Sequence, residues 1–349
     1  MEAVRRVLRF VWNPWRLAAV ACLLICLAVG ALPPARAGGT LLNVSFDPTR
    51  ELYRALDRAF TADYKAKTGE TIIIRTSHGG SGAQARAVID GLPADIVSLG
   101  LAGDVDAIAA RSHKIAADWQ RRLPNNSAPY ASTVVFVVRK GNPKHIRDWN
   151  DLARPDVAVI TPNPKTSGGA RWDYLAAWGY AEKKFGGDEA RIRSFVGAIY
   201  HNAPVLDTGA RGATVSFAQR NLGDVLVGWE SDALLVEREF GKDKFEIVAP
   251  SVSILAALPV ALVDGNVDRN GTRQLAEAYL HFLYTPQAQA IIARHFYRPV
   301  HPEAANPQDL ARFAKIELLS IDRDFGGWAQ AQARFFADGA LFDQIYAAR

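Results

Sequence analysis

The sequence predicts an α/β protein made of two lobes, and two observations support this. Short β-rich runs alternate along the chain with longer stretches of helical periodicity, as in proteins with mainly parallel sheets. The chain has 349 residues, of which 49% are hydrophobic and 22% are charged, so it is long enough for two packed lobes and too balanced for disorder. We therefore expect a single globular monomer.

The N-terminal segment predicts an export signal. Four arginines precede an apolar run at 17–32, and the small-residue triplet Ala35-Arg36-Ala37 follows it. We interpret residues 1–37 as a signal peptide that is cleaved before Gly38. An uncleaved membrane anchor is the alternative, because the apolar run approaches the lower length limit of a membrane span.

The two cysteines and much of the positive charge lie in this segment. Cys22 and Cys26 precede the cleavage point, so the mature chain is expected to have no disulfide. Removal of five arginines and one glutamate leaves 36 basic and 35 acidic residues, a net charge of +1. The pI of about 9.2 therefore indicates neither a nucleic-acid partner nor a membrane surface.

The order of expected elements divides the mature chain. We expect strands at 40–45, 71–75, 95–99, 133–139, 158–161, 224–229 and 245–248. Apolar residues three or four apart predict helices around Leu52 and Leu275. We place one lobe at 38–124 plus 250–300, the other at 125–249, and crossings between them at 125–138 and 248–261. Residues 301–349 are expected to be a helical segment, helical from 307 to 348, that packs back on the body.

Four strand-to-helix loops, two in each expected lobe, share one pattern. In each, a β-rich run ends, a loop rich in Gly, Ser, Thr or Asp follows, and an amphipathic helix begins; the loops lie at 47–51, 77–82, 163–171 and 207–212. In the first, Asp47 suits the N-cap and Pro48 the first helical position. Free N–H groups at helix starts can bind anions, and open α/β sheets bind ligands beyond the carboxyl ends of their strands. Any one loop is ordinary capping, but four of them with hydroxyls at Ser81 and Ser167 predict a shared anion site.

Enzymatic interpretations receive less support. Residues 79–83 approximate the nucleophile elbow around Ser81, but no histidine and carboxylate partner is identifiable, so a secreted serine hydrolase is only an alternative. Asp207-Thr208-Gly209 occurs once, whereas aspartic-protease chemistry needs two carboxylates. Asp104 and Asp106 suit a solvated turn. We expect no catalytic residues, no metal and no cofactor.

At these same loops the sequence closely resembles the periplasmic sulfate-binding proteins of ABC importers, including their thiosulfate-binding relatives. The matching runs are NPKTSGGAR at 163–171, LNVSFDPTRELY at 42–53, SHGGSG at 77–82 and GARGAT at 209–214. The likeness runs from about residue 41 to the C-terminus. Gly69-Glu70 and Thr76-Ser77 depart from the family pattern, which has Gly-Asp and then Gln-Ser before the glycines of the second loop.

The resemblance implies a type II periplasmic binding fold, in which two α/β lobes joined by a hinge close on sulfate. Carried over by position, the donors are the amide N–H groups of Asp47, Gly168, Gly169 and Ala210, the hydroxyls of Ser81 and Ser167, and the indole N–H of Trp229. The residues alone would have assigned Trp229 to the core. The implied partner is the membrane permease of an importer, and the implied location is the periplasm. A preference for thiosulfate, molybdate or tungstate stays open, and we expect Arg171 and Arg211 to pair with local carboxylates.

Overall fold

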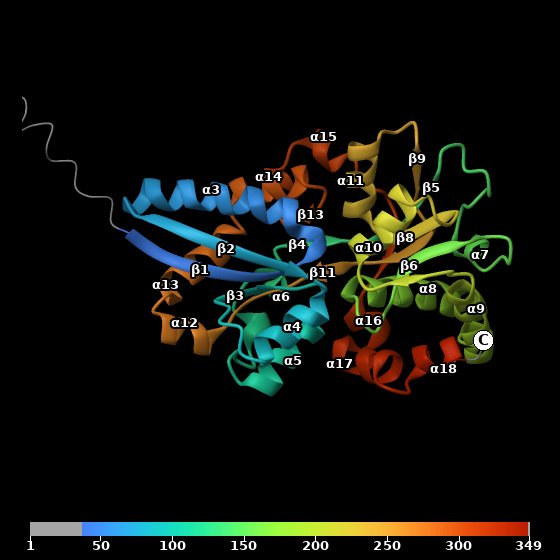
Figure 1. Ribbon diagram of the computed structural model, residues 1–349, viewed down its shortest axis with the longest axis horizontal. Coiled ribbons are helices and arrows are strands. Elements are labelled where there is room, and N and C mark those ends of the chain that lie inside the picture. Colours follow the sequence, from blue (N-terminus) through green and yellow to red (C-terminus); the bar gives the residue numbers. More distant parts are fainter. Residues whose placement is uncertain (1–36, 348–349) are drawn as a thin grey trace, which may run out of the picture.

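The computed structural model describes residues 37–347, which form two α/β lobes side by side (Figure 1). The predicted signal peptide and the last two residues lie outside the described residues. The first lobe contains a four-stranded sheet of order β12-β3-β1-β2. Its strands are β1 (Ala37–Phe46), β2 (Thr71–Gly79), β3 (Ile96–Ser98) and β12 (Val260–Leu262). β1 runs parallel to β2 and β3, and β12 is antiparallel to β3.

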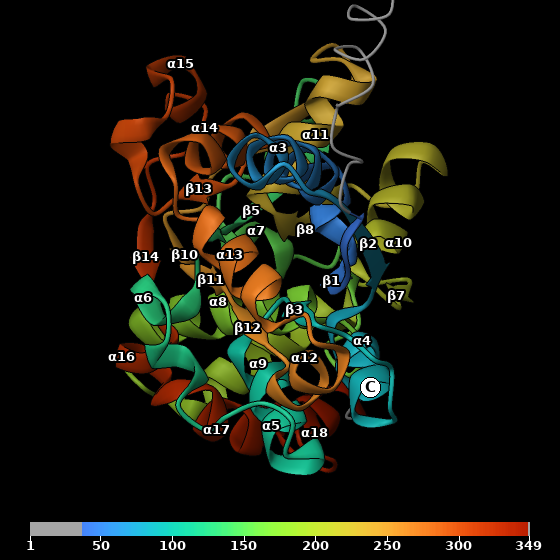
Figure 2. The same ribbon diagram turned by 90° about the vertical axis from the view of Figure 1, so that its left-hand side faces the viewer.

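Helices cover both sides of this sheet. Figure 1 shows α3 above the sheet and α4 and α5 below it, and Figure 2 shows the same order after a turn of 90°. The helices of this lobe are α3 (Arg50–Thr68), α4 (Ser81–Ile89), α5 (Ala102–Ser112), α6 (Pro124–Ser127), α12 (Asp264–Asn270), α13 (Arg273–Phe282) and α14 (Pro286–Arg294). Short 3-10 turns lie at Asp47–Thr49 and Trp119–Arg121.

The second lobe contains a five-stranded sheet of order β7-β6-β8-β5-β9. Its strands are β5 (Val134–Arg139), β6 (Val159–Pro162), β7 (Leu206–Asp207), β8 (Val225–Trp229) and β9 (Phe245–Val248). β6 is parallel to β7 and β8, and β5 is antiparallel to β8 and β9. Its helices are α7 (Trp149–Leu152), α8 (Gly168–Phe185), α9 (Glu189–His201), α10 (Ala210–Thr214) and α11 (Glu230–Phe240), with a π-helical turn at Val215–Gln219.

Two small sheets lie where the lobes join, and the chain passes between the lobes there three times. The three-stranded sheet has the order β11-β4-β13, with β4 (Tyr130–Ser132), β11 (Ala256–Leu258) and β13 (Arg298–Pro299). The two-stranded sheet pairs β10 (Val252–Ile254) with β14 (Glu317–Leu319). The passages run from β4 to β5, from β10 to β11, and from β13 to β14. The sequence indicated only the first two.

The local sequence explains why these elements form. All seven expected strands are present, with ends shifted by a few residues. In α3, the apolar positions Leu52, Leu56 and Phe60 are buried, and the helix ends at Gly69, whose φ of 78° suits glycine. None of the helices within residues 37–347 has the length and apolar character needed to span a membrane.

The prediction of one helical run at the C-terminus is wrong. The segment is divided into α15 (Pro307–Leu310), β14, α16 (Ile321–Phe325), α17 (Gly327–Ala331), a π-helical turn at Gln332–Phe336 and α18 (Leu341–Ala347). Gly326, Gly327 and Gly339 interrupt the helices with positive φ angles. The segment packs mainly on the second lobe, where the rings of Phe335, Phe336 and Phe342 contact Tyr174.

A polar cluster is buried in the first lobe. The Asp57 carboxylate accepts hydrogen bonds from the hydroxyls of Tyr279 and Thr76, and the hydroxyl of Tyr53 bonds that of Tyr130 at 2.8 Å. Burial raises the pKa of Asp57 to about 6, although the two hydroxyl donors act in the opposite direction. Ionised Asp57 therefore costs free energy in the folded protein.

We predict that Asp57→Asn stabilises the protein at neutral pH. A carboxyl whose pKa is higher in the folded state binds more protons there, so its contribution to stability is lost as the pH rises from about 4 to 6. At pH 8 the free energy of unfolding of the variant should exceed that of the wild type by about 1–3 kcal/mol, and at pH 4 the two should be equal. Urea denaturation measures both values. Equal pH profiles for the two proteins would contradict this.

Candidate anion-binding site

All seven residues expected to bind a ligand lie around one pocket between the lobes. The pocket is lined by Phe46, Asp47, Pro48, Gly79, Gly80, Ser81, Ser167, Gly168, Gly169, Gly209, Ala210 and Trp229. The first lobe contributes the ends of β1 and β2, and the second contributes the starts of α8 and α10 and the end of β8. The four loops predicted from sequence thus converge on one place.

The first loop differs from its prediction in one respect. Asp47 is not the N-cap residue, because β1 stays extended through Phe46, which takes that position with a φ of −89° and a ψ of 153°. Asp47 begins the 3-10 turn, so Pro48 is its second residue and not the first helical residue that the sequence predicted. The Asp47 carboxylate pairs with Arg50 at 3.1 Å, so it is turned to a cation of its own turn. This leaves the amide as the group that Asp47 presents to the pocket.

Ser81 begins α4 and is buried, with 2% of its surface exposed. Its hydroxyl accepts a hydrogen bond from the Gly100 amide at 2.9 Å and donates one to Asp104 at 2.6 Å. To donate to an anion, this hydroxyl has to turn away from Asp104, because it carries a single proton. Asp104 lies in α5 and is buried, so the prediction of a solvated turn is wrong for it.

Ser167 is the N-cap residue of α8 and has a different arrangement. Its hydroxyl oxygen accepts from the Ala170 amide at 3.4 Å, which leaves the hydroxyl proton available for a ligand. Gly168 and Gly169 occupy the first turn of α8, where amides have no partner within the helix. The Ser167 hydroxyl and these two amides form a group of donors at a single helix start.

Both helix-start positions require glycine because groups of neighbouring elements approach them closely. A Cβ atom on Gly168 would lie 2.9 Å from Leu101 Cδ2 and 3.1 Å from Ser81 Cβ, both on the first lobe. A Cβ atom on Gly169 would lie 2.6 Å from the indole nitrogen of Trp229. Contacts under 3.0 Å essentially never occur for real Cβ atoms and 3.1 Å is unusually tight, so a side chain at either position would force Leu101, Ser81 or the indole to shift.

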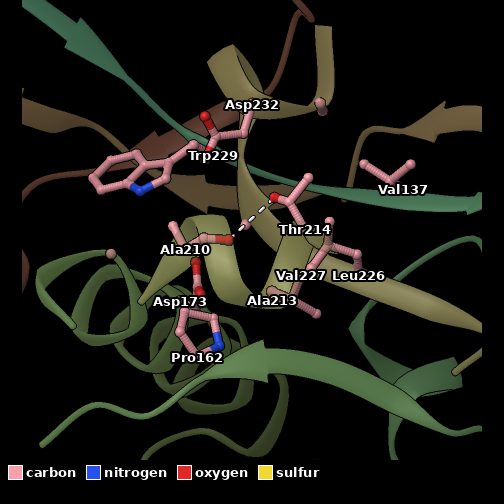
Figure 3. A pocket seen from close by; sticks show the side chains of 13 residues that line it. Val137, Pro162, Asp173, Ala210, Ala213, Thr214, Leu226, Val227, Trp229 and Asp232 are labelled. Carbon is pink, nitrogen blue, oxygen red and sulfur yellow. Dashed lines mark hydrogen bonds between the residues drawn. The ribbon is translucent and has the colours of Figure 1, made fainter. Parts of the chain in front are cut away.

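Trp229 ends β8 and is 2% exposed, and its indole N–H has no hydrogen-bond partner among the described residues. Figure 3 shows the adjoining pocket, in which the indole lies beside Ala210 at the start of α10. The Ala210 carbonyl accepts from the Thr214 hydroxyl at 3.1 Å, within the first turn of that helix. A buried donor without a partner is costly, so the Trp229 indole N–H, which lies at the pocket, is suited to donate to a bound acceptor.

No lysine or arginine lines this pocket, and burial favours the protonated form of two carboxyls near it. Burial raises the pKa of Asp173 well above its usual range, and the Thr161 hydroxyl opposes this only in part. Burial also raises the pKa of Asp232 to about 7, with Arg211 acting in the opposite direction. Uncharged carboxyls repel an anion much less than carboxylates do.

Charged groups instead link the lobes at two edges of the pocket. Arg171 lies 3.6 Å from Asp104, and Arg211 lies 3.5 Å from Glu51. Both arginines thus pair with carboxylates, but with those of the opposite lobe, so the expectation of local partners is wrong. A third link is the hydrogen bond from the Trp172 indole to the Gly100 carbonyl at 2.8 Å.

Sequence reasoning missed the loop that follows β3. Gly100 and Asp104 in this region contact Ser81, and they also meet Trp172 and Arg171 of the second lobe. A signal was present, because a β-rich run at 95–99 is followed by Gly100 and Gly103 and then by a helix. It was a fifth case of the same strand-to-helix pattern.

The arrangement does not resemble a catalytic centre. The Ser81 hydroxyl donates to a carboxylate and accepts from an amide, and neither partner is a histidine. Asp207 accepts from the Ser216 hydroxyl at 3.2 Å. No group of three or more acidic, histidine or cysteine side chains in the described part of the chain is placed to hold a metal ion.

Two α/β lobes with a donor-lined pocket between them define a solute-binding protein. The family of bacterial extracellular solute-binding proteins matches residues 49–298, and the chain belongs to this family. It is thus a binding component of transport and not an enzyme. The match also confirms the α/β, type II periplasmic binding fold.

Among similar proteins, the sulfate-binding protein of Escherichia coli (strain K12) is 58% identical over 305 residues, which cover 87% of this chain and 92% of that relative. The thiosulfate-binding protein of Pseudomonas aeruginosa is 48% identical over 335 residues, covering 95% and 98%. The solved structure of the sulfate-binding protein SubI from Mycobacterium tuberculosis H37Rv has a TM-score of 0.76 at 32% identity and covers 86% of this chain and all of that one. The periplasmic binding protein AfuA from Actinobacillus pleuropneumoniae shares the fold, with a TM-score of 0.62 at 17% identity, covering 89% and 98%.

We predict that Gly168→Ala weakens anion binding at least about tenfold, because its Cβ atom would meet Leu101 and Ser81 of the opposite lobe before closure is complete. Gly168→Asp should bind more weakly still, since it adds a negative charge. Calorimetry measures both affinities. The matched control is Gly228→Ala, because a Cβ atom there has nothing within 4 Å. Unaltered affinity in Gly168→Ala would show that the anion does not need these loops to meet.

Proposed function

We propose that this protein is the periplasmic sulfate receptor of an ABC importer. The observation that carries the proposal is the composition of the pocket, in which amides, hydroxyls and one unpartnered indole N–H from both lobes converge without a cation. The proposed ligands to sulfate are Asp47, Ser81, Ser167, Gly168, Gly169, Ala210 and Trp229. The high identity to curated sulfate-binding proteins supports the same ligand.

A pocket of neutral donors suits a small dianion. Burial of a doubly charged ion is very costly unless donors replace its hydration shell. Amides at helix starts supply such donors, and the helix dipoles behind them favour negative charge. Of the helix starts that meet here, those of α3 and α8 have long helices behind them.

The same composition favours sulfate over hydrogen phosphate. Sulfate carries no proton at neutral pH and can accept from every donor around it. Hydrogen phosphate carries a proton that needs an acceptor, and a site made only of donors leaves that proton unpaired. The carboxylate of Asp47, which lines the pocket, is paired with Arg50 and is therefore a poor acceptor for that proton.

The transport cycle follows from the two lobes. The closed state brings together donors that the open state separates, so an anion that contacts both lobes favours closure. The closed surface would then be read by the membrane permease. We propose that the protein acts as a monomer in the periplasm, after cleavage of residues 1–37.

A thiosulfate receptor is the second candidate, because a thiosulfate-binding protein is 48% identical over nearly the whole chain. Thiosulfate has the same charge and shape class, but one sulfur replaces an oxygen. The larger atom needs more room, and it accepts hydrogen bonds more weakly than oxygen does. Molybdate and tungstate are larger tetrahedral dianions, so their affinities also test how large an anion the pocket can hold.

Titration calorimetry of the mature protein with sulfate, thiosulfate, molybdate and phosphate tests the function. We expect tight sulfate binding, weaker phosphate binding, and no turnover in an esterase assay that tests Ser81 as a nucleophile. Tighter binding of thiosulfate than of sulfate would select the second candidate. Binding of none of these anions, or ester turnover abolished by Ser81→Ala, would reject the proposal.

We further predict that Ser167→Ala weakens sulfate binding by about 1–3 kcal/mol, because the free proton of this hydroxyl is lost from the buried pocket. Ser81→Ala should lie in the same range, toward its lower end, since the Ser81 proton is shared with Asp104. The control is Ser112→Ala, whose hydroxyl bonds the Ile108 carbonyl on α5 outside the pocket. A Ser167→Ala variant with wild-type affinity would remove this hydroxyl from the proposed ligand set.

A further inference from the structure

A buried ion pair joins the two lobes on the side where the chain passes between them. Glu230 begins α11 of the second lobe and is 2% exposed. Arg298 lies in β13 of the junction sheet and binds this carboxylate with two nitrogens, Nε to Oε2 at 2.7 Å and Nη2 to Oε1 at 2.8 Å. This two-point geometry fixes the relative orientation of both groups.

The pair also holds the third passage of the chain. Ala314 lies between β13 and β14, and its amide donates to Glu230 Oε1 at 2.8 Å. The carbonyl of Ala314 accepts from Arg298 Nη2, also at 2.8 Å. Both peptide groups of one residue are therefore held by the two members of the ion pair.

The other two passages meet at the same place. β13 pairs with β4, where Arg298 lies opposite Ala131. The Glu230 amide donates to the Thr133 carbonyl at 2.8 Å, in the passage from β4 to β5. The Thr133 hydroxyl bonds the Ile254 carbonyl at 2.9 Å, in the passage from β10 to β11. The pair thus lies where all three connections between the lobes come together.

Glu230 is next to Trp229, whose indole is the donor without a partner in the pocket. Trp229 is the N-cap residue of α11 and pairs with Val134 through β8 and β5. Its ring also lies 6.0 Å from that of Phe46, on the first lobe. The backbone of Trp229 is therefore held on its C-terminal side by a residue that is fixed to the passages.

A buried ion pair is not explained by stability alone. Apolar residues of similar volume often stabilise a protein as well or better, because burying charge costs solvation free energy. A two-point pair with further bonds to a backbone does fix geometry, which apolar packing does less strictly. This points to a role in placing a neighbouring group.

We propose that Glu230 and Arg298 are positioning residues that hold the Trp229 indole at the pocket and tie it to the passages about which the lobes move. They do not touch the anion. The inference rests on the proposed function, because it takes the pocket to be an oxyanion site.

A double-mutant cycle tests this proposal. Sulfate affinity is measured by calorimetry for the wild type, Glu230→Gln, Trp229→Phe and the double variant. We expect Glu230→Gln to lower affinity about tenfold in the wild type and less than about threefold in the Trp229→Phe background, since the indole through which it acts is then absent. Equal losses in both backgrounds would overturn the proposal, as would a lowered unfolding temperature with unchanged affinity.

Two further variants separate geometry from charge and from general damage. Arg298→Lys keeps the charge but loses the two-point contact, and we expect it to lower sulfate affinity as Glu230→Gln does. If Glu230→Gln does not fold, Arg298→Lys takes its place in the cycle. Wild-type affinity in Arg298→Lys would overturn the proposal. The matched control is Asp309→Asn, which breaks the 3.0 Å pair with Arg312 in the same third passage and should leave affinity unchanged.

A measurement without ligand distinguishes failure of this proposal from failure of the proposed function. The protein is labelled with 5-fluorotryptophan, and the Trp229 resonance is assigned by its loss in Trp229→Phe. Glu230→Gln should shift or broaden this fluorine resonance and leave that of Trp119 unchanged. If the Trp229 resonance shifts in Glu230→Gln but the wild type does not bind sulfate, the proposed function is rejected and the positioning role is kept. An unmoved Trp229 resonance beside intact sulfate binding would reject the positioning role alone.

Discussion

The structure depends on one constraint, which is that a dehydrated dianion must receive a hydrogen bond on every side. Water supplies these bonds outside the protein, and a pocket that removes water has to replace them. Amides at the starts of helices are suited to this, because the helix leaves them without partners of its own. The strands, loops and helices around Asp47 in the first lobe and around Ser167 and Ala210 in the second place such groups at one pocket from both lobes. The unpartnered indole N–H of Trp229 is the clearest sign that an acceptor belongs there.

Charge is kept out of the pocket and placed around it. Arg171 and Arg211 each bridge the lobes at an edge of the pocket, whereas Asp47 is turned to Arg50. An arginine inside the pocket would offer strong attraction, but it would also have to be desolvated together with the anion and would be left uncompensated when the anion departs. At the edge, the two arginines are paired with carboxylates of the opposite lobe and so link the lobes without entering the pocket. This division suits a receptor that must release its ligand.

Much of the fold and the site could be predicted from the sequence, because both depend on patterns of residues that are close together along the chain. Strand-to-helix loops with glycine and hydroxyl residues indicated Ser81 and Ser167 as residues of one site, the family resemblance added Ala210, and all three line one pocket. What sequence could not supply was contact across the chain. The partners of Arg171 and Arg211 lie on the opposite lobe, far away in sequence, and one of them, Asp104, is buried in contact with that lobe. The N-cap assignment to Asp47 failed for a local reason, because the 3-10 turn begins at Asp47, one residue earlier than the position of Pro48 indicated.

Trp229 shows why residue type alone was insufficient. A tryptophan at the end of an apolar strand is normally core, and its side chain is indeed buried. Its role follows from what its nitrogen lacks and from what lies beside it. Gly169 leaves room for the indole, and Glu230 fixes the following residue to the junction. A donor on the ring of a buried side chain can be aimed only if the backbone that carries it is held, and in this protein that backbone is held where the lobes are joined. Any movement of the lobes about the junction therefore changes the position of this donor. The geometry of the hinge and the affinity of the pocket for its anion are coupled for this reason.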